Sequence, residues 1–287
     1  MDSTQSLVLS QLPYVDAELN YVKRSDEELY SYGHAREDGP QNNITLDPQS
    51  MRVYDVNPVA GRLDLDRHGF KLVPRHTAVT DYSEAQIKSV AYPEIAQMVA
   101  EHTGAAFVKL YDYTIRKSVE GEISIGQVNG RAAGSEQRAP DPRMHNDYTH
   151  KSAAVRVASL LGDEAPKYAG KRFVFLNIWH PLRGPLHDKP LAFADPGSIE
   201  EGDLVPVTLM FPGRKGSMFA LSHNAAHRWF YARGMQPDQA WIFKVYDAST
   251  SLGPQFVPHG AFTDPSAPEN HLPRESIEFR ALALFDD

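Results

Sequence analysis

From residue 105 onward, apolar positions come in short runs rich in aromatic and β-branched residues, which is the pattern of β-strands. The runs are separated by Gly, Pro, Asp and Asn, which favour turns. In order they read AAFVKLYDYTI, KRFVFLNIWHPL, KPLAFAD, DLVPVTLMF, SMFAL, HRWFYA, AWIFKVYD, FVPHGAF and SIEFRALALF. One helical run, residues 152–161, interrupts them. Most of this part of the chain is therefore predicted to be β-structure.

A second helical pattern precedes these strands, over residues 83–104. Ser83 followed three residues later by Gln86 forms a capping box, which predicts the start of a helix. Pro93 predicts a break after which the helix restarts, and Gly104 is a natural C-terminal cap. We expect two helices that cover one face of a sheet.

Residues 1–80 are mixed and rich in turns, with short alternating runs such as MRVYDV and GFKLVPR. We expect them to form an N-terminal extension packed on a core domain of residues 81–287, the whole being one structural unit. Many short strands beside a helical pair predict a mainly β fold with flanking α-helices. The expected core is a double-stranded β-helix, the jelly roll of cupin-like proteins.

Composition narrows the possible partners. A chain of 287 residues with 41% hydrophobic and 10% aromatic residues can bury a full core. The formal net charge of -8, with the two signs interspersed, argues against nucleic acid and anionic membranes as partners. No apolar run approaches the ~20 residues of a membrane span. With no basic leader either, we expect a cytoplasmic protein.

The sequence contains no cysteine, so every metal ligand must be a histidine, aspartate or glutamate. His145 and Asp147 in RMHNDYTHKSA are the first candidates. In a strand, side chains two residues apart point to the same face. A third imidazole would complete the two-histidine, one-carboxylate set that leaves three positions open on Fe(II). A hydrogen-bonded pair without a metal is the other interpretation of a His-x-Asp motif.

The last strand predicts a polar face that points inward. Ser276, Glu278 and Arg280 alternate with apolar residues at 277, 279, 281, 283 and 285. Buried charges are costly unless they are paired, and a dicarboxylate co-substrate would pair them. Arg274 at the strand entrance offers a fork for a carboxylate, and Ser276 can add a hydrogen bond. An Arg–Glu pair between strands is the alternative.

Five segments carry a resemblance to a known family: HNDYTHKSAAVR, LNIWHPLRGPLHDKPLAFAD, HRWFYARGMQPDQAWIFKVYDAS, PHGAF and PRESIEFR. Together they resemble the Fe(II)/2-oxoglutarate-dependent dioxygenases, and most closely the fungal hydroxylase/desaturase family that is similar to cephem methoxylase. The similarity runs from about residue 60 to the end. It departs at Ala248, where the family usually has Ser, and at Gly260, where Thr or Ser is usual. These departures concern the substrate rather than the cofactors.

Two histidines can supply the third ligand. His227 has a spacing that suits a ligand-bearing strand, but Trp229 two residues later would point its bulk at the co-substrate. His259 is followed by small Ala261, and Arg274 comes behind it. We therefore choose His259, and place His227, Trp229 and Tyr231 in the substrate pocket.

The resemblance implies that His145, Asp147 and His259 bind Fe(II), and that 2-oxoglutarate and O2 are co-substrates. Beyond Arg274 and Ser276, two more residues are expected to bind the co-substrate: Arg280 and Lys244. A buried lysine needs a partner, and Glu278 or a carboxylate ligand could provide it. Arg156 is a further candidate for substrate contact.

The expected reaction hydroxylates, desaturates or cyclises a small molecule, of secondary-metabolite or amino-acid origin. Two rival functions share the jelly roll. A metal-dependent hydrolase or cofactor-free metal oxygenase would make Arg274 structural, and a non-catalytic binding protein would leave His145 and Asp147 without a metal. Neither the substrate nor the oligomeric state follows from the sequence.

Overall fold

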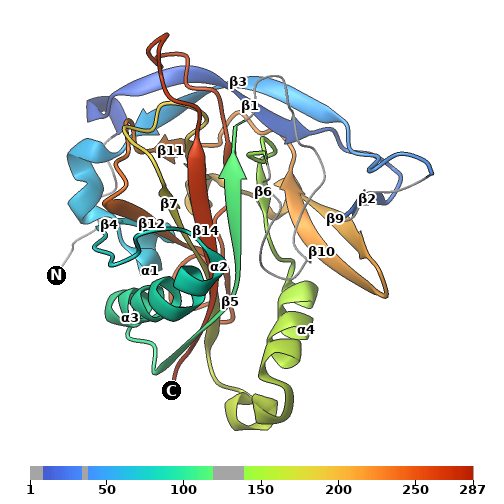
Figure 1. Ribbon diagram of the computed structural model, residues 1–287. Helices are drawn as coiled ribbons and strands as arrows, with labels where there is room; N and C mark the ends of the chain where they lie inside the picture. The colour runs from blue at the N-terminus through green and yellow to red at the C-terminus, as the bar shows by residue number, and fades with distance from the viewer. Residues whose placement is uncertain (1–8, 34–37, 119–138, 287) are drawn as a thin grey trace, which may run out of the picture.

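Two β-sheets form the body of the molecule (Figure 1). The computed structural model describes residues 9–33, 38–118 and 139–286. The larger sheet contains, in spatial order, β1 (Tyr14–Val22), β3 (Leu46–Asp55), β11 (Trp229–Tyr231), β8 (Leu191–Ala194), β13 (His259–Ala261), β6 (His145–Asn146), β10 (Arg214–Leu221), β9 (Leu204–Phe211) and β2 (Leu29–Tyr32). The smaller sheet contains β4 (Phe70–Pro74), β12 (Gln239–Asp247), β7 (Phe173–Pro181), β14 (Glu275–Leu284) and β5 (Phe107–Lys117). The predicted mainly β fold is confirmed.

The two sheets pack face to face through aromatic side chains. Phe70 of the smaller sheet stacks on Phe193 of the larger one, with ring centroids 5.3 Å apart. Trp241 and Phe243 of β12 also contact Phe193, at 4.8 and 4.9 Å. All four side chains are buried, so this aromatic layer fixes the distance between the sheets.

Helices cover the other face of the smaller sheet, as the pattern predicted (Figure 1). Ile87, Ile95 and Val99 pack against the apolar side chains of β14 that alternate along the strand: Ile277, Phe279, Ala281 and Ala283. Because successive side chains of a strand point to opposite faces, the polar residues of β14 must face the larger sheet. The apolar-out, polar-in interpretation of this strand is thus confirmed.

The helical segment after Ser83 is continuous through α2 (Glu84–Gln86), the π-helical turn η3 (Ile87–Ala91) and α3 (Tyr92–Thr103). The Ser83 side chain accepts from the Gln86 backbone N–H, and Gly104 ends the segment in the left-handed conformation, so both predicted boundaries are correct. The Gln86 side chain bonds Thr80 instead of closing the box. The predicted break before Pro93 is wrong, because a wider π turn absorbs the irregularity.

The remaining helical elements are short, except the one that follows β6. α4 spans His150–Leu161, two residues more than predicted, because Thr149 and Ser152 form a capping box at its start. This cap anchors the chain immediately after Asp147. The short elements are η1 (Leu9–Gln11), η2 (Asn57–Arg62), α1 (Leu65–His68), η4 (Gly162–Tyr168), η5 (Pro196–Ser198) and η6 (Glu201–Asp203).

The described part of residues 1–80 is built into both sheets. β1 and β3 pair with each other, and β3 joins β11 in parallel. β2 joins β9 in parallel, and β4 pairs with β12. The division into an extension of residues 1–80 and a core domain of residues 81–287 stays a prediction. Within the described ranges, no helix has the length and apolar character needed to cross a membrane.

Candidate metal centre

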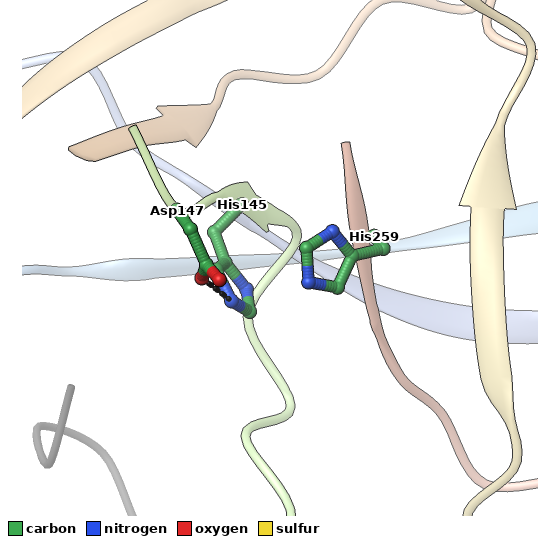
Figure 2. Close-up of side chains that lie close together, drawn as sticks. All are labelled: His145, Asp147 and His259. Atoms are coloured by element: carbon green, nitrogen blue, oxygen red, sulfur yellow. Dashed lines mark ion pairs between the residues drawn. The ribbon is translucent and has the colours of Figure 1, made fainter. Parts of the chain in front are cut away.

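The three predicted ligands come together between the sheets (Figure 2). His145 lies in β6, Asp147 follows directly, and His259 in β13 is paired with His145 across the strands. One ligand atom of each residue lies within 4.8 Å of the others, and all three side chains are buried. The residue pair at i and i+2 and the neighbouring strand thus supply two imidazoles and one carboxylate to a single point.

Backbone contacts orient both imidazoles. His145 Nδ1 lies 2.8 Å from the Arg143 carbonyl oxygen, and His259 Nδ1 lies 3.0 Å from that of Val257. A carbonyl accepts only, so Nδ1–H must be the donor in each ring. This leaves the lone pair on Nε2, the form in which histidine binds a metal. Asp147 Oδ1 lies 3.6 Å from His145 Nε2.

The electrostatics of the cluster suit a bound cation. Burial, and then the neighbouring His145, lower the pKa of His259 to about 4, so this imidazole is neutral. Burial alone would also lower the pKa of His145, but the carboxylates of Asp147 and Asp141 raise it. Burial would raise the pKa of Asp147, yet His145 and the charge of Arg280 hold it low. The group therefore offers one fixed negative charge and two donor nitrogens.

A small enclosed pocket joins this cluster to Arg274. The Arg274 side chain is buried, donates through Nε to Ser276 Oγ at 2.9 Å and through Nη1 to the Lys189 carbonyl at 2.6 Å. Burial, and then the charge of Arg116, lower its pKa to about 9, so it is still charged at neutral pH. The pocket is lined by Arg116, Asp141, His145, Asp147, Leu191, His259, Gly260, Arg274, Glu278 and Arg280.

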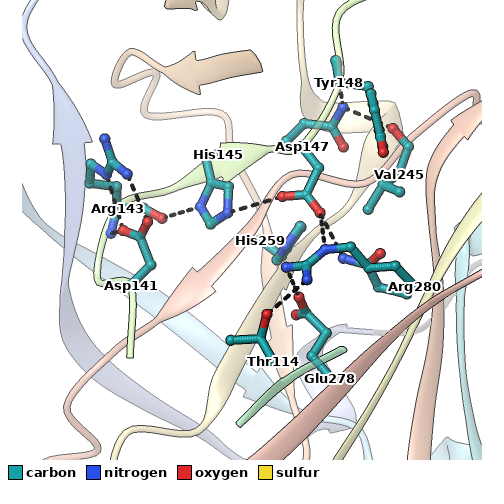
Figure 3. A network of polar contacts seen from close by, with 12 residues as sticks. Thr114, Asp141, Arg143, His145, Asp147, Tyr148, Val245, His259, Glu278 and Arg280 are labelled. Carbon is teal, nitrogen blue, oxygen red and sulfur yellow. Dashed lines mark hydrogen bonds and ion pairs between the residues drawn. The ribbon is translucent and has the colours of Figure 1, made fainter. Parts of the chain in front are cut away.

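Arg280 lies beside Asp147 and is already paired (Figure 3). Its guanidinium donates to Glu278, to Asp112 at 3.2 Å and to Thr114 at 2.9 Å. Its Nε is 3.8 Å from Asp147 Oδ2, beyond hydrogen-bonding distance. Arg280 thus lines the pocket near the carboxylate, with its charge largely compensated by acidic neighbours.

Lys244 lies away from the cluster, and the prediction of its partner is wrong. Its Nζ contacts Asp247 at 2.8 Å and Asp66 at 3.0 Å rather than Glu278. The register of β12 shifts between Lys244 and Tyr246, which marks a bulge. A bulge re-aims the following side chains, so Asp247 can face Lys244 although it is three residues on.

His227 is satisfied in a different cluster. Its Nε2 lies 2.9 Å from Asp203 Oδ2, and its Nδ1 lies 3.2 Å from the hydroxyl of Tyr21. Trp229 Nε1 donates to the same hydroxyl at 2.8 Å, and the Tyr231 hydroxyl accepts from Arg233 at 3.0 Å. The pocket lining contains none of the predicted substrate residues His227, Trp229 and Tyr231.

Arg156 also lies outside the pocket lining, although it is connected to it. Its guanidinium lies 5.0 Å from the centre of the Tyr111 ring, and the Tyr111 hydroxyl is 2.9 Å from that of Tyr148. Tyr148 directly follows Asp147 in the chain. A role of Arg156 in substrate binding stays a prediction.

Three residues of the site were not found from the sequence: Arg116, Asp141 and Asn177. Arg116 of β5 is paired with Ser276, and Asn177 of β7 with Arg280, so both share the inward face of β14. Asp141 binds the guanidinium of Arg143, at 2.8 Å for the closest contact. The only signal for these positions is the register between strands distant in sequence, which one sequence does not show.

The structure gives a reason for Gly260, where the family usually has Thr or Ser. A Cβ at this position would lie 2.5 Å from the Arg143 carbonyl oxygen and 2.6 Å from Met144 Cε. β13 approaches β6 so closely here that only glycine fits without a backbone shift.

Comparison with known proteins places the chain in a family. A protein-family model described as an oxidoreductase/YMDC permease-like domain matches residues 19–284. The chain belongs to this oxidoreductase family. The hydroxylase/desaturase efuI of Hormonema carpetanum is 27% identical to this oxidoreductase over 96% of the chain and 97% of the relative. The Fe(II)/2-oxoglutarate-dependent dioxygenase nvfI of Aspergillus novofumigatus is 28% identical, over 90% and 91%.

The fold of this oxidoreductase matches solved structures of the same kind. The iron and alpha-ketoglutarate-dependent endoperoxidase NvfI superposes with a TM-score of 0.83 at 27% identity, over 96% of this chain and 99% of NvfI. The predicted resemblance to Fe(II)/2-oxoglutarate-dependent dioxygenases and to the fungal hydroxylase/desaturase family is confirmed. The jelly-roll core is confirmed with it.

Proposed function

We propose that His145, Asp147 and His259 hold the Fe(II) of this Fe(II)/2-oxoglutarate-dependent oxygenase, and that its substrate is a small organic molecule oxidised at a C–H bond. One observation carries the proposal. The three ligand candidates and the buried Arg274 line the same enclosed pocket. The metal ligands and a guanidinium that can bind a carboxylate therefore line one pocket, as binding of a 2-oxo dicarboxylic acid requires.

The residues fit the metal by their donor chemistry. Two imidazoles and one carboxylate are a donor set that would hold Fe(II) and would leave positions open for the co-substrates. When bound, Fe(II) couples the reduction of O2 to the conversion of 2-oxoglutarate into succinate and CO2. The chain supplies two oriented imidazoles and excludes bulk water from the buried cluster.

Arg274 and Ser276 are proposed to bind the distal carboxylate of 2-oxoglutarate. The Arg274 side chain contacts only neutral groups, Ser276 and the Lys189 carbonyl, through its hydrogen bonds. Across the described residues no carboxylate forms an ion pair with it at 4.0 Å or less. A buried guanidinium without a directly paired carboxylate is costly; the charges of Glu278 and Asp188 offset part of that cost, and a bound carboxylate would offset more of it.

Arg116 adds a second positive charge at this end of the pocket. It stands opposite Ser276, and its Nη1 donates to the Ala139 carbonyl at 2.8 Å. Its proximity is what depresses the pKa of Arg274 after burial. Two guanidinium groups that repel each other favour the binding of an anionic ligand near both of them.

The relatives are named for hydroxylation, desaturation and endoperoxide formation. We infer that this enzyme carries out a C–H oxidation of the same group on a small molecule. A cytoplasmic location and the lack of nucleic-acid or membrane partners stay predictions from composition.

The test is a turnover screen. Purified protein reconstituted with Fe(II) without O2 is given 2-oxoglutarate, O2 and a panel of small metabolites and amino acids, and succinate is measured. We expect succinate release that rises with one class of substrate and requires Fe(II). Product formation without succinate would instead identify a hydrolase or a metal oxygenase that needs no 2-oxo acid.

A further inference from the structure

The carboxylate of Asp147 is held by one amide. Asn177 Nδ2 donates to Asp147 Oδ2 at 2.8 Å, and both side chains are buried. An ionised carboxylate only accepts, so the amide must present its NH2 group to it. In the described part of the chain, this is the single hydrogen bond of normal length to Asp147, because Arg280 Nε stays 3.8 Å away.

The two oxygens of Asp147 therefore have different surroundings. Oδ1 lies beside His145 Nε2, on the side of the ligand cluster (Figure 3). Oδ2 accepts the hydrogen bond from Asn177. Asn177 comes from β7, where it is paired with Arg280 of β14, so its position is fixed by the middle of the smaller sheet. Its own Oδ1 is buried without a partner among the described residues. The amide is thus oriented by the carboxylate at the cost of an unpaired carbonyl.

This asymmetry matters for coordination chemistry. A carboxylate can bind a metal through one oxygen or through both. If one oxygen binds, three of the six coordination positions of the metal stay open beside the two imidazoles. If both oxygens bind, only two positions stay open. 2-Oxoglutarate with O2 needs three. The hydrogen bond that occupies Oδ2 therefore decides whether the co-substrates fit together.

We propose that Asn177 is a positioning residue that keeps Asp147 a one-oxygen ligand. This inference rests on the proposed function, since it assumes that Asp147 binds the metal. Asn177 does not contact the reacting atoms. By holding Oδ2, it reserves the third open position on the metal, so it acts on co-substrate binding rather than on metal affinity.

The experiment uses the full chain loaded with Mn(II) instead of Fe(II), so that no turnover is required. Water-proton relaxation measures the number of exchangeable waters on Mn(II), and calorimetry measures the dissociation constants of Mn(II) and of 2-oxoglutarate. The variants are Asn177→Leu, which keeps the volume without a donor, and Asn177→Ala. The matched control is Thr114→Val, which removes a buried hydrogen bond to Arg280 and leaves Asp147 untouched.

For wild type and Thr114→Val we expect three waters. For both Asn177 variants we expect two, a fall of about one third in the relaxation enhancement. 2-Oxoglutarate should bind about tenfold more weakly to them or worse, while the Mn(II) dissociation constant changes less than about threefold. Circular dichroism checks folding, and if Asn177→Leu does not fold, Asn177→Ala gives the decision.

The opposing result is equally definite. Three waters on Mn(II) in a folded Asn177 variant, or an equal weakening of Mn(II) and 2-oxoglutarate binding, would show that Asn177 is only structural. Failure of the proposed function would look different, because wild type itself would then bind no 2-oxoglutarate in the presence of Mn(II).

Discussion

The molecule buries two histidine–aspartate pairs, one at β6 and one between η6 and the segment before β11, and they have opposite characters. In the pair His145–Asp147, Nε2 and Oδ1 are 3.6 Å apart, and His259 stands beside them. In the pair His227–Asp203, the distance is 2.9 Å, and the second ring nitrogen is bonded to Tyr21. The side chains of the first pair are too far apart to hydrogen-bond each other and line a pocket, while those of the second pair are hydrogen-bonded to each other.

The difference shows how a metal site can be told from a structural histidine. Both rings of the first cluster use Nδ1 on a backbone carbonyl and leave Nε2 free. His227 uses both of its nitrogens on protein groups, so it has no lone pair to offer. The residue types in the two pairs are the same. What differs is the number of hydrogen-bonding positions that the fold leaves open.

The largest effect should separate the two aspartates. Asp147→Ala removes the only carboxylate of the three ligands, so we expect metal affinity to fall more than about 100-fold with the fold intact. Asp203→Ala should keep the metal and instead lower the free energy of unfolding by about 1.5–3 kcal/mol. Calorimetric metal titration and urea unfolding measure the two quantities. Full metal-dependent activity of Asp147→Ala would contradict the assignment.

The histidines give the next contrast. His259→Ala should lose Fe(II) binding, because only one imidazole remains at the cluster. His227→Ala should keep its iron, since both ring nitrogens of His227 bond Asp203 and Tyr21. Iron content after anaerobic reconstitution, read beside circular dichroism, distinguishes them. If iron is lost from His227→Ala but not from His259→Ala, the choice of third ligand is wrong.

At Arg274 the expected effect is on the co-substrate and leaves the metal in place. Arg274→Ala should weaken 2-oxoglutarate binding by several kcal/mol, since each charge-assisted hydrogen bond contributes about 1.5–3 kcal/mol. Arg274→Lys keeps the charge but not the fork, so its apparent Michaelis constant for 2-oxoglutarate should lie between wild type and Arg274→Ala. Substrate affinity at saturating 2-oxoglutarate should change little. A structural Arg274 would lower stability in both variants and leave co-substrate affinity unchanged in the folded protein.

The smallest effect concerns the His227–Asp203 pair and how the free energy of unfolding changes at acidic pH. Burial lowers the pKa of His227 below its ordinary value of 6.5, although Asp203 opposes this. Below that pH the unfolded chain takes up a proton that the folded chain resists, so stability falls as the pH drops. His227→Phe should remove up to about 2 kcal/mol of the stability lost between pH 7 and pH 5. Urea unfolding at both pH values measures it, and an unchanged loss would contradict the shift.

Much of the fold followed from local pattern. The alternation in β14 predicted both its faces, and Ser83 and Gly104 predicted the ends of a helical segment. His145 and Asp147 were brought together by a spacing of two, which needs no knowledge of distant strands. These predictions depend on neighbours in sequence, where propensity and periodicity are informative.

The remainder depends on distant pairings. The position of β13 beside β6 brings His259 rather than His227 to the cluster, and motif spacing alone left both possible. The bulge after Lys244 changed its partner, and the register of β5 and β7 on β14 placed Arg116 and Asn177 on the inward face. Such registers are set by packing across the sheet, which one sequence does not reveal.

The place of β14 in its sheet has a consequence for biosynthesis. This strand lies between β7 and β5, yet it is made long after both. Until residues 275–284 have left the ribosome, β5 and β7 must stay apart by the width of a missing strand, about 9–10 Å centre to centre. Two unpaired edges are exposed during that time, and they invite pairing with other chains. A nascent chain halted before β14 would thus be inactive and prone to aggregation, and we expect a chaperone to bind it.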